Sequence, residues 1–188
     1  YLAQKLPEDA CIGFGSRKPK KVVVLATKES HCLGELLMQY FTQELSIDIQ
    51  AVISNHQNLQ DLVNKFQLPY HFVSTEGLTR EDHEKALIDV ISQYETDYLV
   101  LAKYMRILTP SFVEKFQNKI INIHHSFLPA FPGPQPYDEA YKRGVKFIGA
   151  TSHFVTNDLD AGPIIAQSVE AVDHTHGPKD LARVGREI

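Results

Sequence analysis

Residues 120–131, IINIHHSFLPAF, hold the side chains best suited to chemistry. An apolar, strand-like run ends in Asn122, His124 and His125 and is followed by prolines. Side chains of a strand alternate between its faces, so Asn122 and His124 share one face and the neighbouring isoleucines the other. His125 falls on the isoleucine face if the strand extends that far. An amide and an imidazole at a strand end could form a small catalytic pair; the alternative is two polar residues on a solvated edge.

A second polar segment, TSHFVTNDLDAGPII at residues 151–165, places Asp158, Asp160 and Gly162 between two apolar runs. Taken alone, this composition is common in turns that join strands. Downstream of the asparagine and histidine pair it becomes a more specific pattern.

Metal binding is the first alternative chemistry that the nine histidines suggest. The candidates are His124 with His125, His153, and His174 with His176. Neighbours in sequence cannot both turn inward from a regular strand, and the chain has no HExxH motif or Cys/His cluster. We therefore expect ordinary hydrogen-bonded histidines and no metal site.

Other nucleophiles are also poorly supported by the sequence. It has neither a G-x-S-x-G elbow nor a G-x-x-x-x-G-K-[ST] phosphate loop. Cys32 follows His31, but sequence neighbours rarely form a nucleophile and base pair. We expect Cys32 to pack as a small hydrophobic residue near a helix start.

Composition indicates an ordinary globular protein. The 188 residues suit one domain, or one domain and a fragment of another, and 43% of them are hydrophobic. The formal net charge of −4 argues against nucleic acid as a partner. Apolar runs are too short to span a bilayer, and we see no signal-peptide core. With only two cysteines, too few for a disulfide scaffold, a reducing cytoplasm is the expected location.

Strand and helix patterns alternate from residue 21 onward. Continuous apolar runs predict buried strands, and apolar residues at helical spacing predict amphipathic helices. Expected strands are 22–26, 47–54, 70–74, 97–102, 119–124, 147–155 and 163–172, and expected helices are 32–45, 58–66, 79–94, 136–143 and one starting at Thr109-Pro110. This order predicts a Rossmann-like α/β fold, with a mostly parallel central sheet and helices on both faces. Ligands of such sheets bind beyond the carboxyl ends of the strands, where Asn122, His124 and Lys103 would lie.

The motifs together resemble the folate-dependent formyltransferase fold. That family has an Asn-x-His strand end followed by S-x-L-P, and later an Asp in a D-A-G type loop. The match falls on Asn122, His124, Ser126, Leu128, Pro129 and Asp160. It extends from about Lys21 to the end of the chain.

The branch of the family is indicated by other segments. Glycinamide ribonucleotide formyltransferases follow their first strand with a glycine-rich SGxGSN loop, whereas this chain has ATKESHCLGELL. Without clustered glycines the backbone is less able to wrap a phosphate. TKESHCLGELL and LAKYMRILTP instead look like the 10-formyltetrahydrofolate deformylases, which hydrolyse the folate donor.

The resemblance implies roles for individual residues. His124 would stabilise the tetrahedral oxyanion and Asn122 would donate a second hydrogen bond to it. Asp160 would hold the imidazole or take a proton from the attacking water. His125 would position that water, or merely pack. The pterin slot would be formed by Met105, Arg106, Ile107 and Leu108, with the loop around Val155 opposite.

The resemblance also sets expectations for the whole protein. The substrate would be 10-formyltetrahydrofolate, without a prosthetic group, and the full-length protein would form a homo-oligomer. Residues 1–20 would be a linker or the tail of an N-terminal ACT-type regulatory domain. Residues 21–188 would be the catalytic domain, incomplete at its C-terminal end. The segment Pro132–Pro136 is richer in proline than the family pattern, so its effect on substrate access stays open. The alternatives are a formyltransferase and a catalytically silent folate-binding module.

Overall fold

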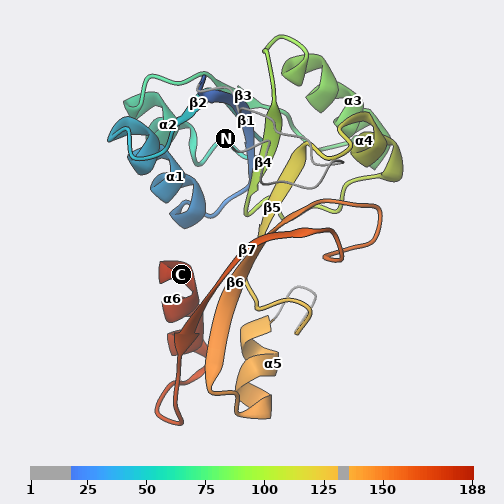
Figure 1. Ribbon diagram of the computed structural model, residues 1–188. Coiled ribbons are helices and arrows are strands. Elements are labelled where there is room, and N and C mark those ends of the chain that lie inside the picture. Colours follow the sequence, from blue (N-terminus) through green and yellow to red (C-terminus); the bar gives the residue numbers. More distant parts are fainter. Residues whose placement is uncertain (1–17, 131–135) are drawn as a thin grey trace, which may run out of the picture.

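The computed structural model describes residues 18–130 and 136–188, and these residues form one seven-stranded sheet (Figure 1). Its strand order is β3-β2-β1-β4-β5-β6-β7. The strands are β1 (Lys20–Ala26), β2 (Ile47–Ser54), β3 (Tyr70–Phe72), β4 (Tyr98–Ala102), β5 (Ile120–His124), β6 (Phe147–Phe154) and β7 (Ile164–Ala171). The first five run parallel, and β6 and β7 are antiparallel to their neighbours. The predicted mostly parallel α/β sheet is confirmed.

Two hydrophobic cores lie on the two faces of the parallel strands. Alternation along β1 sends Val22 and Val24 to one core and Val23 and Leu25 to the other. The first core is covered by α1 (His31–Phe41) and α2 (Gln60–Lys65), and the second by α3 (Arg80–Ile91) and α4 (Pro110–Lys115). Burial on both faces explains why these strands read as continuous apolar runs.

The antiparallel strands have a smaller core of their own. Ala140, Ile148, Val172 and Leu181 pack between β6, α5 (Pro136–Arg143) and α6 (Pro178–Glu187). Figure 1 shows β6 and β7 as a long ribbon that extends away from the parallel strands, with these helices beside it. β7 is one of the two edge strands of the sheet, and each of its residues is exposed.

Helix boundaries follow local capping chemistry. The hydroxyl of Thr79 accepts a hydrogen bond from the Asp82 N–H at 3.1 Å, and the Thr109 hydroxyl accepts one from the Phe112 N–H at 3.3 Å. Both predicted helix starts are therefore confirmed. The helix predicted to reach residue 45 ends at Phe41 instead, because Gln43 adopts a left-handed φ of 62° that cannot continue a helix.

The predictions for the N-terminal segment and the proline-rich loop remain untested. Residues 1–17 and 131–135 lie outside the described residues, so the expected linker and most of Pro132–Pro136 have no structural account. The sheet begins at Lys20, next to the expected domain boundary. Among the described residues, no helix combines the length and apolar character needed to cross a membrane.

Candidate active site

A cavity of about 340 Å³ lies at the carboxyl ends of β4 and β5. Three segments form most of its lining: residues 103–108 after β4, residues 122–125 at the end of β5, and residues 155–160 after β6. The structure brings together every site residue that the sequence analysis named: Asn122, His124, His125, Asp160, Met105, Arg106, Ile107, Leu108 and Val155. The roles assigned to them remain predictions.

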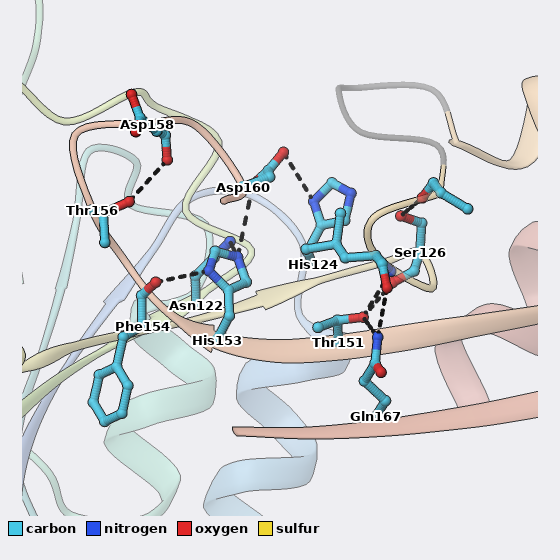
Figure 2. Close-up of polar contacts among 12 residues, drawn as sticks. Asn122, His124, Ser126, Thr151, His153, Phe154, Thr156, Asp158, Asp160 and Gln167 are labelled. Atoms are coloured by element: carbon cyan, nitrogen blue, oxygen red, sulfur yellow. Dashed lines mark hydrogen bonds and ion pairs between the residues drawn. The ribbon is translucent and has the colours of Figure 1, made fainter. Parts of the chain in front are cut away.

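His124 and Asp160 form the polar centre of this cavity. The His124 Nδ1 lies 3.4 Å from the Asp160 Oδ2, and the two side chains are only 6% and 9% exposed. Figure 2 shows both side chains turned toward each other from β5 and from the loop after β6. Because little water reaches the pair, the interaction is weakly screened. The carboxylate therefore orients the imidazole.

The loop that carries Asp160 has a constrained backbone. Asp160 has a left-handed φ of 54°, which aspartate tolerates better than most residues. A Cβ at Gly162 would lie 1.7 Å from the carbonyl oxygen of Phe154, so only glycine fits there. This close approach explains the glycine of the D-A-G segment.

His153 joins the centre, although the sequence analysis treated it as an ordinary histidine. β6 pairs with β5 so that His153 stands opposite Asn122. Its Nε2 lies 3.3 Å from the Asn122 Nδ2 and 3.8 Å from the Asp160 Oδ1 (Figure 2). A signal existed in the alternation of Thr151 and His153 along a strand, but the pairing register was not readable from the sequence.

Hydrogen bonding defines the tautomer of His153. The Nδ1 lies 2.9 Å from the backbone carbonyl of Phe154, which can only accept, so the Nδ1 carries the proton. In the neutral ring the Nε2 then accepts from the Asn122 amide group. His153 thereby orients Asn122 and leaves the second amide hydrogen to be donated elsewhere.

His124 and His125 both line the cavity, although they are neighbours. The argument that neighbouring histidines cannot both face inward applies within a regular strand, and β5 ends at His124. The two rings have centroids 5.3 Å apart, and the His125 ring is 5.6 Å from that of Tyr137. His125 is therefore placed beside the centre.

The S-x-L-P segment is fixed by the antiparallel strands. The Thr151 hydroxyl donates to the Ser126 carbonyl at 2.8 Å and accepts from the Leu128 N–H at 3.0 Å. The Gln167 amide donates to the Leu128 carbonyl at 2.9 Å. These bonds (Figure 2) hold the chain immediately after His124.

The wall formed by residues 103–108 combines apolar side chains with a buried anchor. Met105 and Ile107 are 53% and 57% exposed, so they offer apolar surface at the cavity. Burial raises the pKa of Tyr104, which keeps its hydroxyl neutral. At the end of the segment, the buried carboxylate of Glu84 accepts hydrogen bonds from the N–H and the hydroxyl of Thr109. This anchor holds the wall against α3.

No cluster with metal-ligand character occurs in residues 18–130 or 136–188. Instead, Asp160 lies close to both His124 and His153, and His153 contacts Asn122. What the arrangement offers is an oriented amide donor, an imidazole held by a carboxylate, and an adjoining apolar wall. Such a set can stabilise the oxyanion that forms when a nucleophile adds to a carbonyl carbon. It can also transfer a proton in the same reaction.

Comparison with known proteins gives the class of this chain. Residues 20–188 match the family model described as formyl transferase. The chain therefore belongs to the formyl transferase family. A solved glycinamide ribonucleotide transformylase from Symbiobacterium toebii shares this fold, with a TM-score of 0.86 and 28% identity over 96% of this chain and 86% of that one.

Within this family the chain belongs to the formyltetrahydrofolate deformylases. It is 53% identical over its whole length to proteins of that name from Haemophilus influenzae and Escherichia coli, and it spans 67% of each. A solved formyltetrahydrofolate deformylase from Pseudomonas syringae has a TM-score of 0.86 at 44% identity. That match covers 90% of this chain and 57% of the solved one, so the chain spans about three fifths to two thirds of the length of these relatives.

Proposed function

We propose that this protein hydrolyses 10-formyltetrahydrofolate to formate and tetrahydrofolate. The observation that carries the proposal is the meeting of Asn122 with the buried His124 and Asp160 side chains in one cavity, together with an apolar wall. The relatives at 53% identity are named formyltetrahydrofolate deformylases, which supports the same substrate here.

The apolar wall binds the pterin ring in this proposal. Met105, Ile107 and Leu108 pack against it from one side, and Val155 from the other, with backbone groups and Arg106 available to polar ring edges. The buried Glu84–Thr109 anchor keeps that wall in place. The ring then holds the formyl carbon near the polar centre.

The polar centre stabilises the tetrahedral intermediate. The His124 Nδ1 faces the Asp160 carboxylate, which can only accept, so the Nε2 is the ring nitrogen left for the substrate. In the imidazolium form, with both ring nitrogens protonated, this Nε2 donates to the formyl oxygen. The second donor is the Asn122 amide, which His153 orients. Removing one such donor typically lowers kcat about 100- to 1000-fold.

In the proposed hydrolysis, one proton passes from water to N10 through Asp160. Asp160 takes a proton from water as the water oxygen bonds to the formyl carbon, and His125 helps to position that water. The carbon–N10 bond then breaks, N10 takes the proton, and formic acid loses its remaining proton to solvent as formate. No redox partner or prosthetic group is needed for this step.

Formate release tests the proposal directly. We expect formate from 10-formyltetrahydrofolate without any amine acceptor, and we expect D160N to lower kcat about 100-fold or more. The matched control is D61N, which makes the same substitution at an exposed position on α2, outside the cavity. D61N should keep its kcat within about threefold of the unsubstituted protein.

The same assay separates the alternatives. Product formed only when glycinamide ribonucleotide is added would identify a formyltransferase and contradict the proposal. Folate binding without any product would identify a silent binding module.

The resemblance to the deformylases also suggests wider properties of the protein. We propose a homo-oligomer in the cytoplasm, with residues 1–20 as a linker or the tail of an N-terminal ACT-type regulatory domain. Light scattering of the full-length protein measures the first property, and titration with small amino acids tests for regulation. A monomer that ignores such effectors would contradict this part of the proposal.

A further inference from the structure

A group of charged side chains beside the cavity has no role in the chemistry described above. We name Glu29, Lys103 and Arg186 the charged cluster. Lys103 belongs to the cavity wall, Glu29 lies between β1 and α1, and Arg186 lies in the last turn of α6. Three distant parts of the chain therefore contribute to it.

Several contacts hold these parts together. The Thr27 hydroxyl donates to the Lys103 carbonyl at 2.7 Å, which ties the end of β1 to the end of β4. A Cβ at Gly185 would lie 2.0 Å from the Tyr137 hydroxyl oxygen, so the end of α6 rests on Tyr137. Tyr137 in turn packs beside His125 in the cavity wall. The segments that carry Glu29, Lys103 and Arg186 therefore meet next to the site.

Lys103 is the half-buried member of the charged cluster. Its burial lowers its pKa, the Glu29 carboxylate opposes that shift, and the charge of Arg186 adds to it. Burial also lowers the pKa of the adjoining His31, which keeps this imidazole neutral near pH 7. Two cations and one carboxylate leave a single unit of positive charge. That balance suits a small monoanion better than a phosphate dianion, which the exposed Glu29 would repel.

The proposed reaction produces such a monoanion inside this cavity. Formate forms next to the Asp160 carboxylate, which is almost completely buried and repels it. Lys103 lines the same cavity and offers the opposite charge. We propose that Lys103, assisted by Arg186 and limited by Glu29, binds the formate product and draws it away from Asp160. This inference rests on the proposed hydrolysis.

Product inhibition by sodium formate tests the charged cluster, at an ionic strength held constant with sodium chloride. For K103Q we expect the inhibition constant of formate to rise roughly tenfold, because a half-buried charge partner is lost. K103R should stay near the unsubstituted value, because it keeps the charge. For E29Q the constant should fall about threefold, because the competing carboxylate is removed. These opposite signs separate a charge effect from general damage to the fold.

The matched control is K28Q, which removes the same charge from an exposed position one residue before Glu29. We expect it to leave formate inhibition unchanged, since exposed charges are screened. Equal effects of K28Q and K103Q, or no effect of K103Q, would overturn the inference. R186Q should weaken formate binding only about twofold, because Arg186 is also exposed.

A binding measurement without turnover distinguishes the two proposals. Isothermal titration of formate into the full protein saturated with tetrahydrofolate needs no hydrolysis. If the unsubstituted protein releases no formate, the proposed function fails and this titration alone decides the formate site. If it releases formate but the titration shows no dependence on Lys103, only the formate site is overturned.

Discussion

The parallel and antiparallel parts of the sheet differ in how deeply their residues are buried. β1 is buried from Val22 to Ala26, whereas every residue of β7 is exposed. The parallel part has helices and cores on both faces, and the antiparallel ribbon has one small core. The site lies where the two meet, between β5 and β6. Stability is therefore concentrated in the parallel part. The side chains of the site lie at the boundary between the two parts.

The boundary also explains how the polar centre is assembled. β5 supplies Asn122 and His124 at its end, as parallel strands of such sheets do. β6 runs in the opposite direction and sets His153 beside Asn122, and the loop after it returns Asp160 to the same place. Two strand directions bring together residues that a single direction would separate.

The largest expected effect tests whether the parallel part of the sheet contributes more to stability than the antiparallel part. L99A in β4 deletes a side chain that is 0% exposed and should lower the free energy of unfolding by about 2–5 kcal/mol. V169A in β7 deletes one that is 47% exposed and should cost less than about 1 kcal/mol. Urea unfolding of both variants measures the difference. Similar losses would show that stability is shared evenly across the sheet.

A second prediction concerns the boundary itself. H153Q removes the ring that orients Asn122, so we expect kcat for formate release to fall roughly 10- to 100-fold. KM should change much less, because His153 is not part of the apolar wall. S152A, on the same strand, is the control, since the Ser152 hydroxyl bonds to the Ala166 carbonyl on β7. A kcat for H153Q within twofold of the control would remove His153 from the site.

The periodicity of the sequence predicts the parallel part well. Its strands are buried on both faces, so their apolar runs stand out, and Thr79 and Thr109 mark helix starts by their own capping bonds. The resemblance to the formyltransferase family, carried by the sequence motifs, groups Asn122, His124 and Asp160. Their meeting in one cavity agrees with that grouping, while their catalytic roles still await the assays.

Long-range pairing explains what the sequence did not reveal. The role of His153 depends on the antiparallel register of β5 and β6, which no local pattern specifies. α6 was not predicted, because PKDLARVGRE offers few apolar positions and includes Gly185. A Cβ at that glycine would meet the ring of Tyr137, which is a tertiary contact. Residues that respond to distant partners are therefore the ones that sequence patterns miss.

The smallest expected effect compares histidines in the two parts under acid conditions. His83 on α3 is 1% exposed; its Nε2 donates to the Val73 carbonyl at 3.2 Å, and its Nδ1 is buried without a hydrogen bond. Burial lowers the pKa of His83, and the nearby charge of Arg106 lowers it further, against the opposing effects of the Val73 carbonyl and Glu84. His174, in the turn after β7, is exposed.

A lowered pKa in the folded state has a defined consequence for stability. The unfolded chain binds a proton on His83 near pH 6.5, while the folded protein resists it, so the free energy of unfolding decreases as the pH falls below about 6.5. H83Q has no proton to gain there, so its stability should fall less between pH 7.5 and pH 5 than that of the unsubstituted protein. H174Q should leave this decrease as it was. Urea unfolding at the two pH values measures each slope, and an unchanged slope in H83Q would show that the buried histidine of the parallel part is not what makes the fold sensitive to acid.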